Sequence, residues 1–364
     1  MADGGLKAGQ EPERPRRLRD RLGWLFGVEA PLFQPFERLV DPFAPPAAPP
    51  PQGFGAFLRW ALQPMQWPLV ALAVVSLVVG VVEAAVFWMI GGLVDRAGAH
   101  GPEGFLAAEW PWLAMLFVLL VVIRPVATLT QNALGTLSVG PGLNPMTIWR
   151  LHRHTLGQSM RFFEEDFSGR ISQKQMQTAN SLTQAAMESL NALGMMVAYV
   201  VAMTALLATA DWRLAAIAAI WSVAYVASLR WVLPVIRDRA RLRAAARAGV
   251  TGRLVDSITH IKTVKLFAHA AREEENAREA LSRYRGAALS FGRPLMAMRV
   301  VLAVLNTLFM LAILGTGLAL WLGGSATIGV LAMAVMLVLR ATAMSNWIAF
   351  TAMSIFGEIG TVED

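Results

Sequence analysis

Long apolar runs separated by polar segments of very unequal length dominate the chain. Each run is about 20 residues or longer, the length that a helix needs to cross a hydrocarbon core of ~30 Å. The runs lie near residues 67–94, 111–137, 190–210, 212–234, 294–322 and 326–350. This pattern predicts an all-α membrane protein with six transmembrane helices.

Two of the polar segments are long, and they alternate with very short connections. One covers about residues 140–189 and the other residues 237–293. The second contains no proline before Pro294, and Ala, Arg, Leu and Glu, which favour helix, fill most of it. At ~1.5 Å rise per residue, each half of that hairpin extends roughly 40 Å. We therefore predict two long helical hairpins that project from the membrane into water.

The N-terminal residues 1–53 differ from the rest of the chain, because Pro, Ala, Arg and Gly fill most of them. Such a segment does not bury enough apolar surface to fold alone, so we predict a disordered basic tail. Within it, residues 14–26 place a run of arginines beside Trp24 and Phe26, which is also typical of a short helix on anionic lipid headgroups. Residues 54–66 are predicted to form an interfacial elbow helix that opens a six-helix domain spanning residues 54–364.

Composition and charge support a membrane protein with a defined orientation. Mean hydropathy is +0.49 and 16% of residues are charged, against about 25% in soluble chains. Most Lys and Arg residues lie in the tail and the two long segments, whereas the short connections hold only Arg96 and Arg213. The positive-inside rule then predicts a multi-pass protein of the cell (inner) membrane with both termini and both hairpins in the cytosol.

The basic residues follow this topology and not a compact soluble domain, so nucleic acid is not an expected partner. The chain has no cysteine, which excludes disulfides and thiolate ligands, and no other residue spacing predicts a metal site. Ser/His/Asp arrangements and paired catalytic carboxylates are also missing from the loops, so no catalytic residue is predicted.

Three charged residues lie near the middle of predicted spans, where each costs ~2.5 to 3.5 kcal/mol on insertion scales. They are Glu83, Arg124 and Arg340. Counted at ~1.5 Å per residue, all three fall at a similar depth near the middle of the membrane. One interpretation is a polar patch that lines a substrate cavity, and the other is an interhelical ion pair that holds spans together.

Three uncharged polar residues extend the candidate cavity: Gln131, Asn132 and Asn306. They either line the cavity or form hydrogen bonds between neighbouring helices, which is a frequent use of single polar residues in membranes.

Both hairpins carry a distinctive run near the middle. The first reads Phe162, Phe163, Glu164, Glu165, Asp166 and Phe167, followed by Ser168 and Gly169. The second reads Asp256, Ser257, Ile258, Thr259 and His260, followed by Ile261, Lys262, Thr263, Val264 and Lys265.

With six spans and two long loops in this order, the chain resembles the transmembrane domain of an ATP-binding cassette (ABC) exporter of the type I exporter fold. The resemblance covers about residues 54–364. It implies that residues 162–167 form coupling helix 1 and residues 256–260 form coupling helix 2, the two elements that seat on nucleotide-binding domains. A short helix with aromatic anchors suits such a socket, because a few buried aromatic residues carry most of the energy of an interface.

The sequence G-x-x-x-x-G-K-[ST] does not occur, so this chain has no phosphate-binding loop of that type and is expected to bind no cofactor. The resemblance places ATP and Mg²⁺ on a nucleotide-binding domain, either fused downstream in a longer polypeptide or carried by a separate subunit.

The resemblance also implies the function. It predicts a homodimer with a second transmembrane half, which moves an amphipathic or lipid-like substrate by alternating access. Two alternatives remain open at this point. One is the permease subunit of a two-component ABC system. The other is a secondary transporter, coupled to protons through Glu83, or a membrane scaffold without ATP coupling.

Overall fold

The computed structural model describes residues 33–44, 48–51, 53–101, 104–165, 168–266 and 270–363. All regular elements in these ranges are helices, which confirms the predicted all-α class. The first half contains α3 (Gln34–Glu37), α4 (Phe54–Leu62), α5 (Gln66–His100), α6 (Phe105–Val118), α7 (Arg124–Ala133), α8 (Gly140–Leu156) and α9 (Met160–Glu165). The second half contains α10 (Ser168–Glu188), α11 (Gly194–Ala210), α12 (Trp212–Thr259), α13 (Ile261–Leu266), α14 (Ala270–Leu322) and α15 (Ile328–Glu363).

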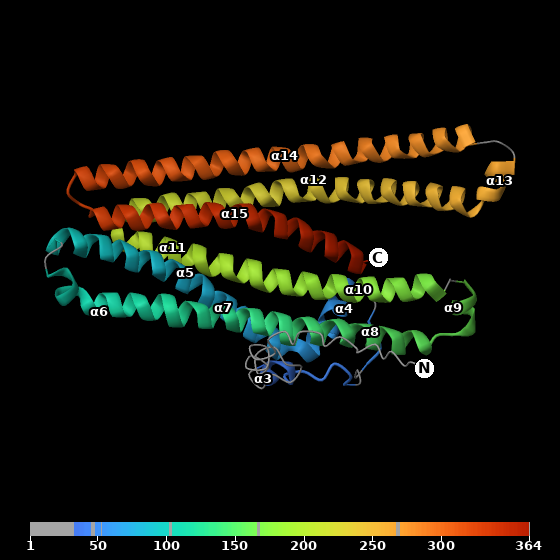
Figure 1. Ribbon diagram of the computed structural model, residues 1–364, viewed down its shortest axis with the longest axis horizontal. Coiled ribbons are helices and arrows are strands. Elements are labelled where there is room, and N and C mark those ends of the chain that lie inside the picture. Colours follow the sequence, from blue (N-terminus) through green and yellow to red (C-terminus); the bar gives the residue numbers. More distant parts are fainter. Residues whose placement is uncertain are drawn as a thin grey trace, which may run out of the picture.

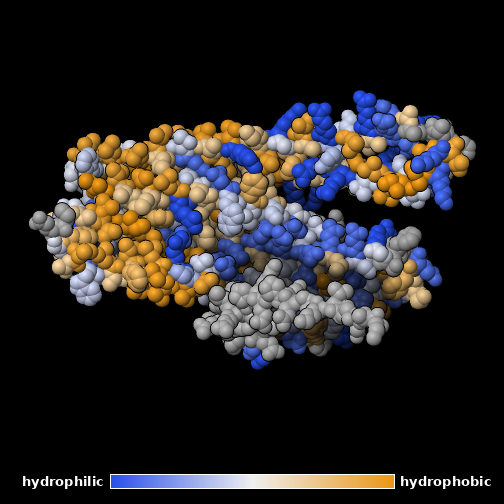
Figure 2. Space-filling model, in the orientation of Figure 1, coloured by the Kyte–Doolittle hydropathy of each residue, from blue (hydrophilic) through white to orange (hydrophobic). Residues whose placement is uncertain are grey.

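Six helical stretches within the described ranges are long and apolar enough to cross a membrane, as predicted. They are Gly55–His100, Phe105–Leu156, Gly169–Ala210, Trp212–Thr259, Ala271–Leu322 and Ile328–Val362. Their apolar parts gather in one half of the molecule, and hydrophilic residues dominate the other half (Figure 2). The chain is thus a multi-pass membrane protein.

Two polar arms extend from the apolar bundle (Figure 1). The first arm consists of α8 and α10, and the second consists of the distal parts of α12 and α14. The short connections lie at the opposite end of the bundle. One of them is the single residue Asp211, whose extended backbone ends α11 and whose side chain accepts a hydrogen bond from the Arg213 N–H at 2.8 Å, capping α12.

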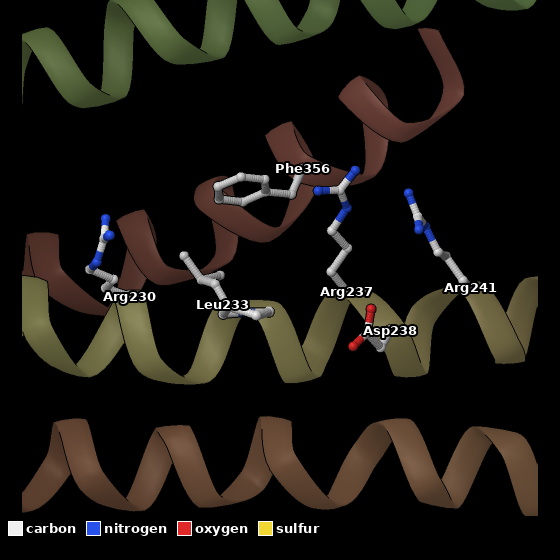
Figure 3. Close-up of a pocket in the computed structure, with 7 residues that line it drawn as sticks. Arg230, Leu233, Arg237, Asp238, Arg241 and Phe356 are labelled. Carbon is white, nitrogen blue, oxygen red and sulfur yellow. The ribbon is translucent and has the colours of Figure 1, made fainter. Parts of the chain in front are cut away.

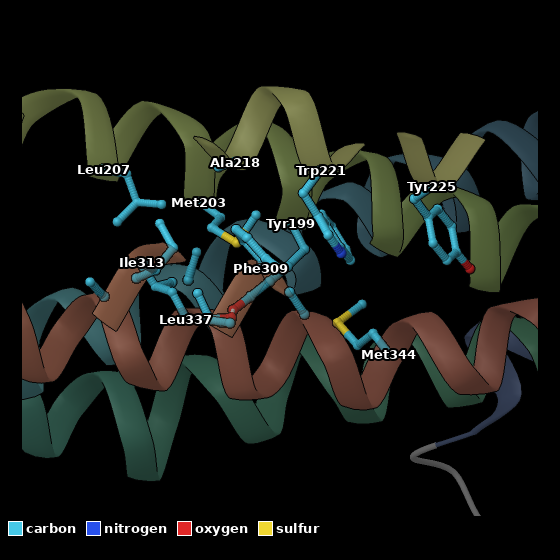
Figure 4. Packing of buried hydrophobic residues seen from close by; sticks show 14 of the residues in the cluster. Tyr199, Met203, Leu207, Ala218, Trp221, Tyr225, Phe309, Ile313, Leu337 and Met344 are labelled. Atoms are coloured by element: carbon cyan, nitrogen blue, oxygen red, sulfur yellow. Dashed lines mark hydrogen bonds between the residues drawn. The ribbon is translucent and has the colours of Figure 1, made fainter. Parts of the chain in front are cut away.

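The largest hydrophobic cluster joins α11, α12, α14 and α15 inside the apolar half (Figure 4). Trp221 stacks on Tyr225 and on Phe309, with ring centroids 5.5 and 4.6 Å apart. Offset aromatic pairs add ~0.5 to 1.5 kcal/mol beyond the area that they bury. This stack joins α12 to α14, the two helices that continue into the second polar arm.

Wider π-helical turns interrupt the helices at three places, Leu119–Ile123, Leu134–Val139 and Ser189–Leu193. Such turns are rare and shift the direction of the side chains around them. The first ends directly before Arg124, and the third contains Asn191. The second contains the buried Ser138, so all three adjoin or contain polar side chains.

Each arm ends in a short helix that turns across its tip, α9 in the first arm and α13 in the second (Figure 1). The second tip differs from the prediction. Residues 256–259 form the last turn of α12, His260 caps it, and the separate short helix begins only at Ile261. The predicted run 256–260 therefore continues α12 and does not form a separate short helix, because no proline or glycine marks an earlier end of α12. Its role as coupling helix 2 stays a prediction.

Part of the tail also differs from the prediction. From residue 33 onward the N-terminal segment packs on the bundle, where the Phe36 carbonyl accepts a hydrogen bond from Ser138 Oγ at 2.5 Å. The Phe43 ring meets Trp149 edge-on at 6.4 Å. Apolar residues of this segment, such as Phe36 and Phe43, form this packing. The prediction of disorder rested on the average composition of residues 1–53, in which Pro and Arg outweigh these few apolar residues. Residues 1–32, 45–47 and 52 lie outside the described ranges.

Candidate substrate cavity and coupling tips

The charged residues predicted at one depth do meet inside the bundle. Arg124 Nε on α7 donates a hydrogen bond to Glu83 Oε1 on α5 at 2.8 Å. Arg340 Nε on α15 lies 3.3 Å from Glu83 Oε2, an ion pair without hydrogen-bond geometry. One carboxylate therefore bridges two guanidinium groups from two other helices, and the cluster carries a net charge of +1.

Exposure divides this cluster into a buried centre and an open rim. The Glu83 side chain is 9% exposed, whereas those of Arg124 and Arg340 are 47% and 36% exposed. A buried carboxylate needs such partners, because leaving it unpaired in a poorly solvated site is very costly. The two arginines, in contrast, keep donors accessible. The interhelical ion pair expected as one interpretation is present, and its accessible side is cationic.

Gln131 belongs to a separate polar network nearer the first arm. Its Nε2 donates to Ser76 Oγ on α5 at 2.9 Å and lies 3.4 Å from Asn191 Oδ1. Ser76 Oγ in turn lies 3.3 Å from Asn191 Oδ1 and donates to the Leu72 carbonyl at 2.8 Å. This network bonds three helical segments together, the structural role weighed for Gln131.

Asn306 forms a third network within the aromatic core. It accepts from Trp221 Nε1 at 3.1 Å and donates to Ser345 Oγ at 2.8 Å, so it connects α12, α14 and α15. Asn306 is only 8% exposed. Asn132, in contrast, is exposed on α7. The six predicted cavity residues are thus not one site, and only Glu83, Arg124 and Arg340 come together.

Several residues of these networks were not singled out from the sequence. Ser76 lies seven residues before Glu83, hence on the same stripe of α5, and that spacing was a usable signal. The roles of Trp221, Asn191 and Ser345 had no such signal, because their partners lie on other helices far away in the sequence.

The arm tips expose large apolar side chains although they lie far from the apolar half (Figures 1 and 2). On α9, the Phe162 and Phe163 rings meet edge-on at 5.4 Å and each residue remains 38% exposed. Glu164 is also exposed, while Asp166 and Phe167 lie outside the described residues. At the second tip, Ile258 is 70% and Leu266 is 80% exposed.

Internal hydrogen bonds hold both arms in shape. In the first arm, Asn144 Nδ2 donates to Asn180 Oδ1 at 2.6 Å. In the second arm, Ser257 Oγ donates to Glu273 Oε2 at 2.7 Å, next to the tip. The tips are therefore presented on braced helical pairs.

Comparison with known proteins decides the family. The family described as "ABC transporter transmembrane region" matches residues 69–344, about three quarters of the chain. The chain belongs to this family. The resemblance drawn from the six spans and two long loops is confirmed, and the alternative of an unrelated secondary transporter or scaffold is not supported.

Two further similarities agree with an ABC transporter transmembrane region. The chain is 30% identical over 337 residues to an "Uncharacterized ABC transporter ATP-binding protein" of Haemophilus influenzae, covering 92% of this chain and 54% of that relative. The chain therefore spans about half the length of the curated relative. Its fold is similar to the structure of a bacterial Atm1-family ABC exporter with ATP bound, with a TM-score of 0.66 and 16% identity, covering 82% of this chain and 52% of that one.

Proposed function

We propose that the chain is the transmembrane half of an ATP-driven exporter, coupled to nucleotide-binding domains through the tips of its two arms. One observation carries this proposal: each arm, polar along most of its length, ends in a short helix with exposed large apolar side chains. An exposed apolar cluster on a polar projection is typical of a surface that binds another protein.

The energetics of the tips support a protein partner. Burying one Leu or Ile side chain contributes ~1.5 to 3 kcal/mol, so Leu266 and Ile258 alone account for a useful part of an interface. The curated relative, of which this chain covers 54%, is described as an ATP-binding protein. That proportion supports a nucleotide-binding domain fused downstream in the same polypeptide, with a separate ATPase subunit as the second possibility.

The mechanism follows from the continuity of the second arm. Helix α12 runs for 48 residues from the membrane to the tip, a distance of roughly 70 Å at ~1.5 Å per residue. Closure of two nucleotide-binding domains around ATP and Mg²⁺ displaces the tips. Because α12 and α14 are unbroken, the displacement reaches the aromatic core around Trp221 and switches the bundle between inward-facing and outward-facing states.

The proposal also covers the oligomeric state, the location and the substrate of the exporter. The assembly is a homodimer in the cell (inner) membrane, with both termini and both arms in the cytosol, as the distribution of Lys and Arg favours. The substrate is amphipathic or lipid-like, and the accessible sides of Arg124 and Arg340 favour an anionic or zwitterionic head group.

The test compares two identical substitutions on the second arm. Leu266→Ser removes an apolar group at the tip, and Leu281→Ser removes one that is 48% exposed further along α14. In the full-length protein reconstituted in liposomes, we expect Leu266→Ser to abolish the stimulation of ATP hydrolysis by a lipid-like substrate, and Leu281→Ser to retain it. Equal stimulation in both variants at equal yield would contradict coupling through this tip.

A further inference from the structure

A pocket is lined by residues of α4, of the 3₁₀ turn Gln63–Met65 and of the start of α5. Its volume is about 610 Å³, within the ~300 to 1,000 Å³ usual for small-molecule sites. The lining side chains that set its chemistry are Arg59, Trp60, Gln63, Gln66, Leu69 and Val70. None of them belongs to the Glu83 cluster, to the other polar networks or to the arm tips.

Three of the lining side chains offer hydrogen-bond donors to a ligand. They are the guanidinium group of Arg59 and the amides of Gln63 and Gln66, all three exposed. They are four and three residues apart, the spacing of neighbours on one helical face. None of the three side chains bonds another residue in the part of the chain that the structure describes. The described lining includes no acidic residue, so its net charge is +1.

Trp60 is held in one orientation at this pocket. Its Nε1 donates a hydrogen bond to the Ala48 carbonyl at 2.9 Å, and its ring centroid lies 5.7 Å from that of Phe57. The Arg150 guanidinium lies 5.6 Å from the same ring, and Arg150 forms no ion pair with a described residue, so its charge adds to that of the lining. Trp67 nearby is 75% exposed. Because tryptophan is enriched where head groups meet acyl chains, both residues indicate that the pocket lies at the membrane surface.

An exposed apolar stripe, here called the α5 stripe, continues from the pocket along α5. It consists of Val70, Val74, Leu77 and Val81, which are 41 to 52% exposed. At 3.6 residues per turn the four positions lie within ~60° of one another, and the stripe is centred about 150° away from Glu83. Its length is about 16 Å at ~1.5 Å per residue, close to half of the ~30 Å hydrocarbon core. The α5 stripe therefore matches a chain in one leaflet of the bilayer.

We propose that this pocket binds the head group of an anionic glycerophospholipid whose acyl chain lies along the α5 stripe. The Arg59 guanidinium pairs with phosphate oxygens in charge-assisted hydrogen bonds, and the amides of Gln63 and Gln66 donate to the remaining oxygens. The described lining offers no carboxylate to the ammonium group of a zwitterionic lipid, so phosphatidylglycerol is favoured over phosphatidylcholine. A soluble anion gains no contact with the stripe.

This inference goes beyond the proposed function, because the lipid is a resident partner of the protein and not its cargo. The α5 stripe faces away from the Glu83 cluster, and the pocket lies between α4 and α5. A lipid in this position bridges the two helices and holds α4 at the membrane surface.

The test places one fluorophore beside the α5 stripe and measures its quenching by lipids with brominated acyl chains. The chain contains no cysteine, so a label on Val78→Cys is unique. Val78 is 45% exposed next to the stripe, and Val201→Cys on α11, where Val201 is 63% exposed, carries the label in the control protein. The purified protein is placed in phosphatidylcholine nanodiscs, and the fraction of brominated lipid that gives half-maximal quenching is measured. We expect this fraction to be severalfold smaller for phosphatidylglycerol than for phosphatidylcholine at Val78, and equal for the two lipids at Val201.

Substitutions of Arg59 test the source of this preference. Arg59→Gln should raise the half-quenching fraction of phosphatidylglycerol at Val78 about fivefold, the effect of one Arg near an anionic membrane surface. Arg38→Gln, an equal loss of charge at an exposed residue outside the pocket lining, should leave it unchanged. Arg59→Lys keeps the charge but loses the guanidinium fork, so it should raise the fraction less than Arg59→Gln does.

Three results would overturn the proposal. The first is equal quenching of the Val78 label by the two brominated lipids in the otherwise unchanged protein. The second is an equal effect of Arg59→Gln and Arg38→Gln, and the third is a loss in Arg59→Gln that Arg59→Lys does not reduce. The measurement involves no nucleotide, so each of these results leaves the proposed ATP coupling through the arm tips untouched.

Discussion

Glu83 is the residue on which the charged cluster depends, because it is the buried partner of two arginines that are themselves partly exposed. Removing one arginine leaves Glu83 paired with the other. Removing both leaves a buried carboxylate without a cation, and removing Glu83 leaves two positive charges whose side chains are partly exposed. The cost of each change therefore depends on what remains buried.

The first prediction concerns this asymmetry. Arg124→Gln and Arg340→Gln should each lower the free energy of unfolding by about 1 kcal/mol, and the double variant by about 3 kcal/mol or more, toward the ~3 to 5 kcal/mol known for broken buried pairs. Thermal unfolding of the three variants in one detergent is the measurement. Strictly additive effects of the two arginine substitutions would show that Glu83 does not couple them.

The second prediction concerns Asn306, which satisfies both Trp221 and Ser345. Asn306→Ala leaves two buried donors or acceptors unmatched, and each costs ~1 to 3 kcal/mol. Thr307→Ala is the matched control, because Thr307 is exposed and bonds only the Ala303 carbonyl of its own helix. A thermal shift of the same size in both variants would contradict the role assigned to Asn306.

At the scale of the element, the end of the bundle with the short connections is held by a close helix crossing. Asp95 on α5 accepts hydrogen bonds at 2.6 Å from both Thr327 Oγ1 and the Gly329 N–H, and so caps the start of α15. A β-carbon at Gly329 would overlap the carbonyl oxygen of Gly91. The two helices approach this closely only because both positions are glycine.

The third prediction follows from that crossing. Gly329→Ala should destabilise the protein by about 1 to 3 kcal/mol, the usual cost of overpacking, because the added β-carbon would overlap the backbone oxygen of Gly91 and the carboxylate of Asp95 that caps α15. Gly315→Ala on α14, where an added β-carbon meets no other atom, should be neutral or stabilising by up to ~1 kcal/mol. Melting temperatures of the two variants test the difference, and equal values would argue against a tight α5–α15 contact.

At the scale of the whole molecule, the fold combines a membrane bundle with two polar arms, and the proposed function assigns ATP binding to a different domain. The fourth prediction is that the isolated 364-residue chain shows no saturable binding of ATP at micromolar concentration, because the sequence has no phosphate-binding loop. Nucleotide titration of the purified chain in detergent is the test, with an assembly that includes the proposed nucleotide-binding domains as the positive control. Tight binding of ATP by the chain alone would contradict the proposal that nucleotide binds to a different domain.

The fifth prediction concerns the motion of the arms. The chain contains no cysteine, so spin labels can be attached to single introduced cysteines without removing native ones. Labels at Ser159 and Lys262, both exposed at the arm tips, should give a distance distribution that shifts when ATP binds to the full-length protein. Labels at Val74 and Val201, both exposed within the apolar half, should shift less. An identical distribution at the tips with and without ATP would contradict coupling through rigid arms.

The sequence by itself determined the class of the protein, the six membrane helices and the two arms. Long apolar runs and clusters of charge can both be read from the local sequence. In a bilayer the apolar runs form the membrane-spanning helices, and the charged segments form the connections outside it. It also brought Glu83, Arg124 and Arg340 to one depth, because depth along a straight helix follows from counting residues.

Only the tertiary structure decided which polar residues share a site. Depth does not specify the rotation of a helix or its neighbours, so Gln131 and Asn306 were grouped with Glu83 although they bond Ser76 and Ser345 in separate networks. The end of α12 at Thr259 also became visible only in the structure, since no proline or glycine within residues 256–265 marks it. A pocket between α12 and α15 was decided in the same way. Arg230 and Arg237 share one face of α12, and they line a pocket only because α15 brings Phe356 across that face (Figure 3).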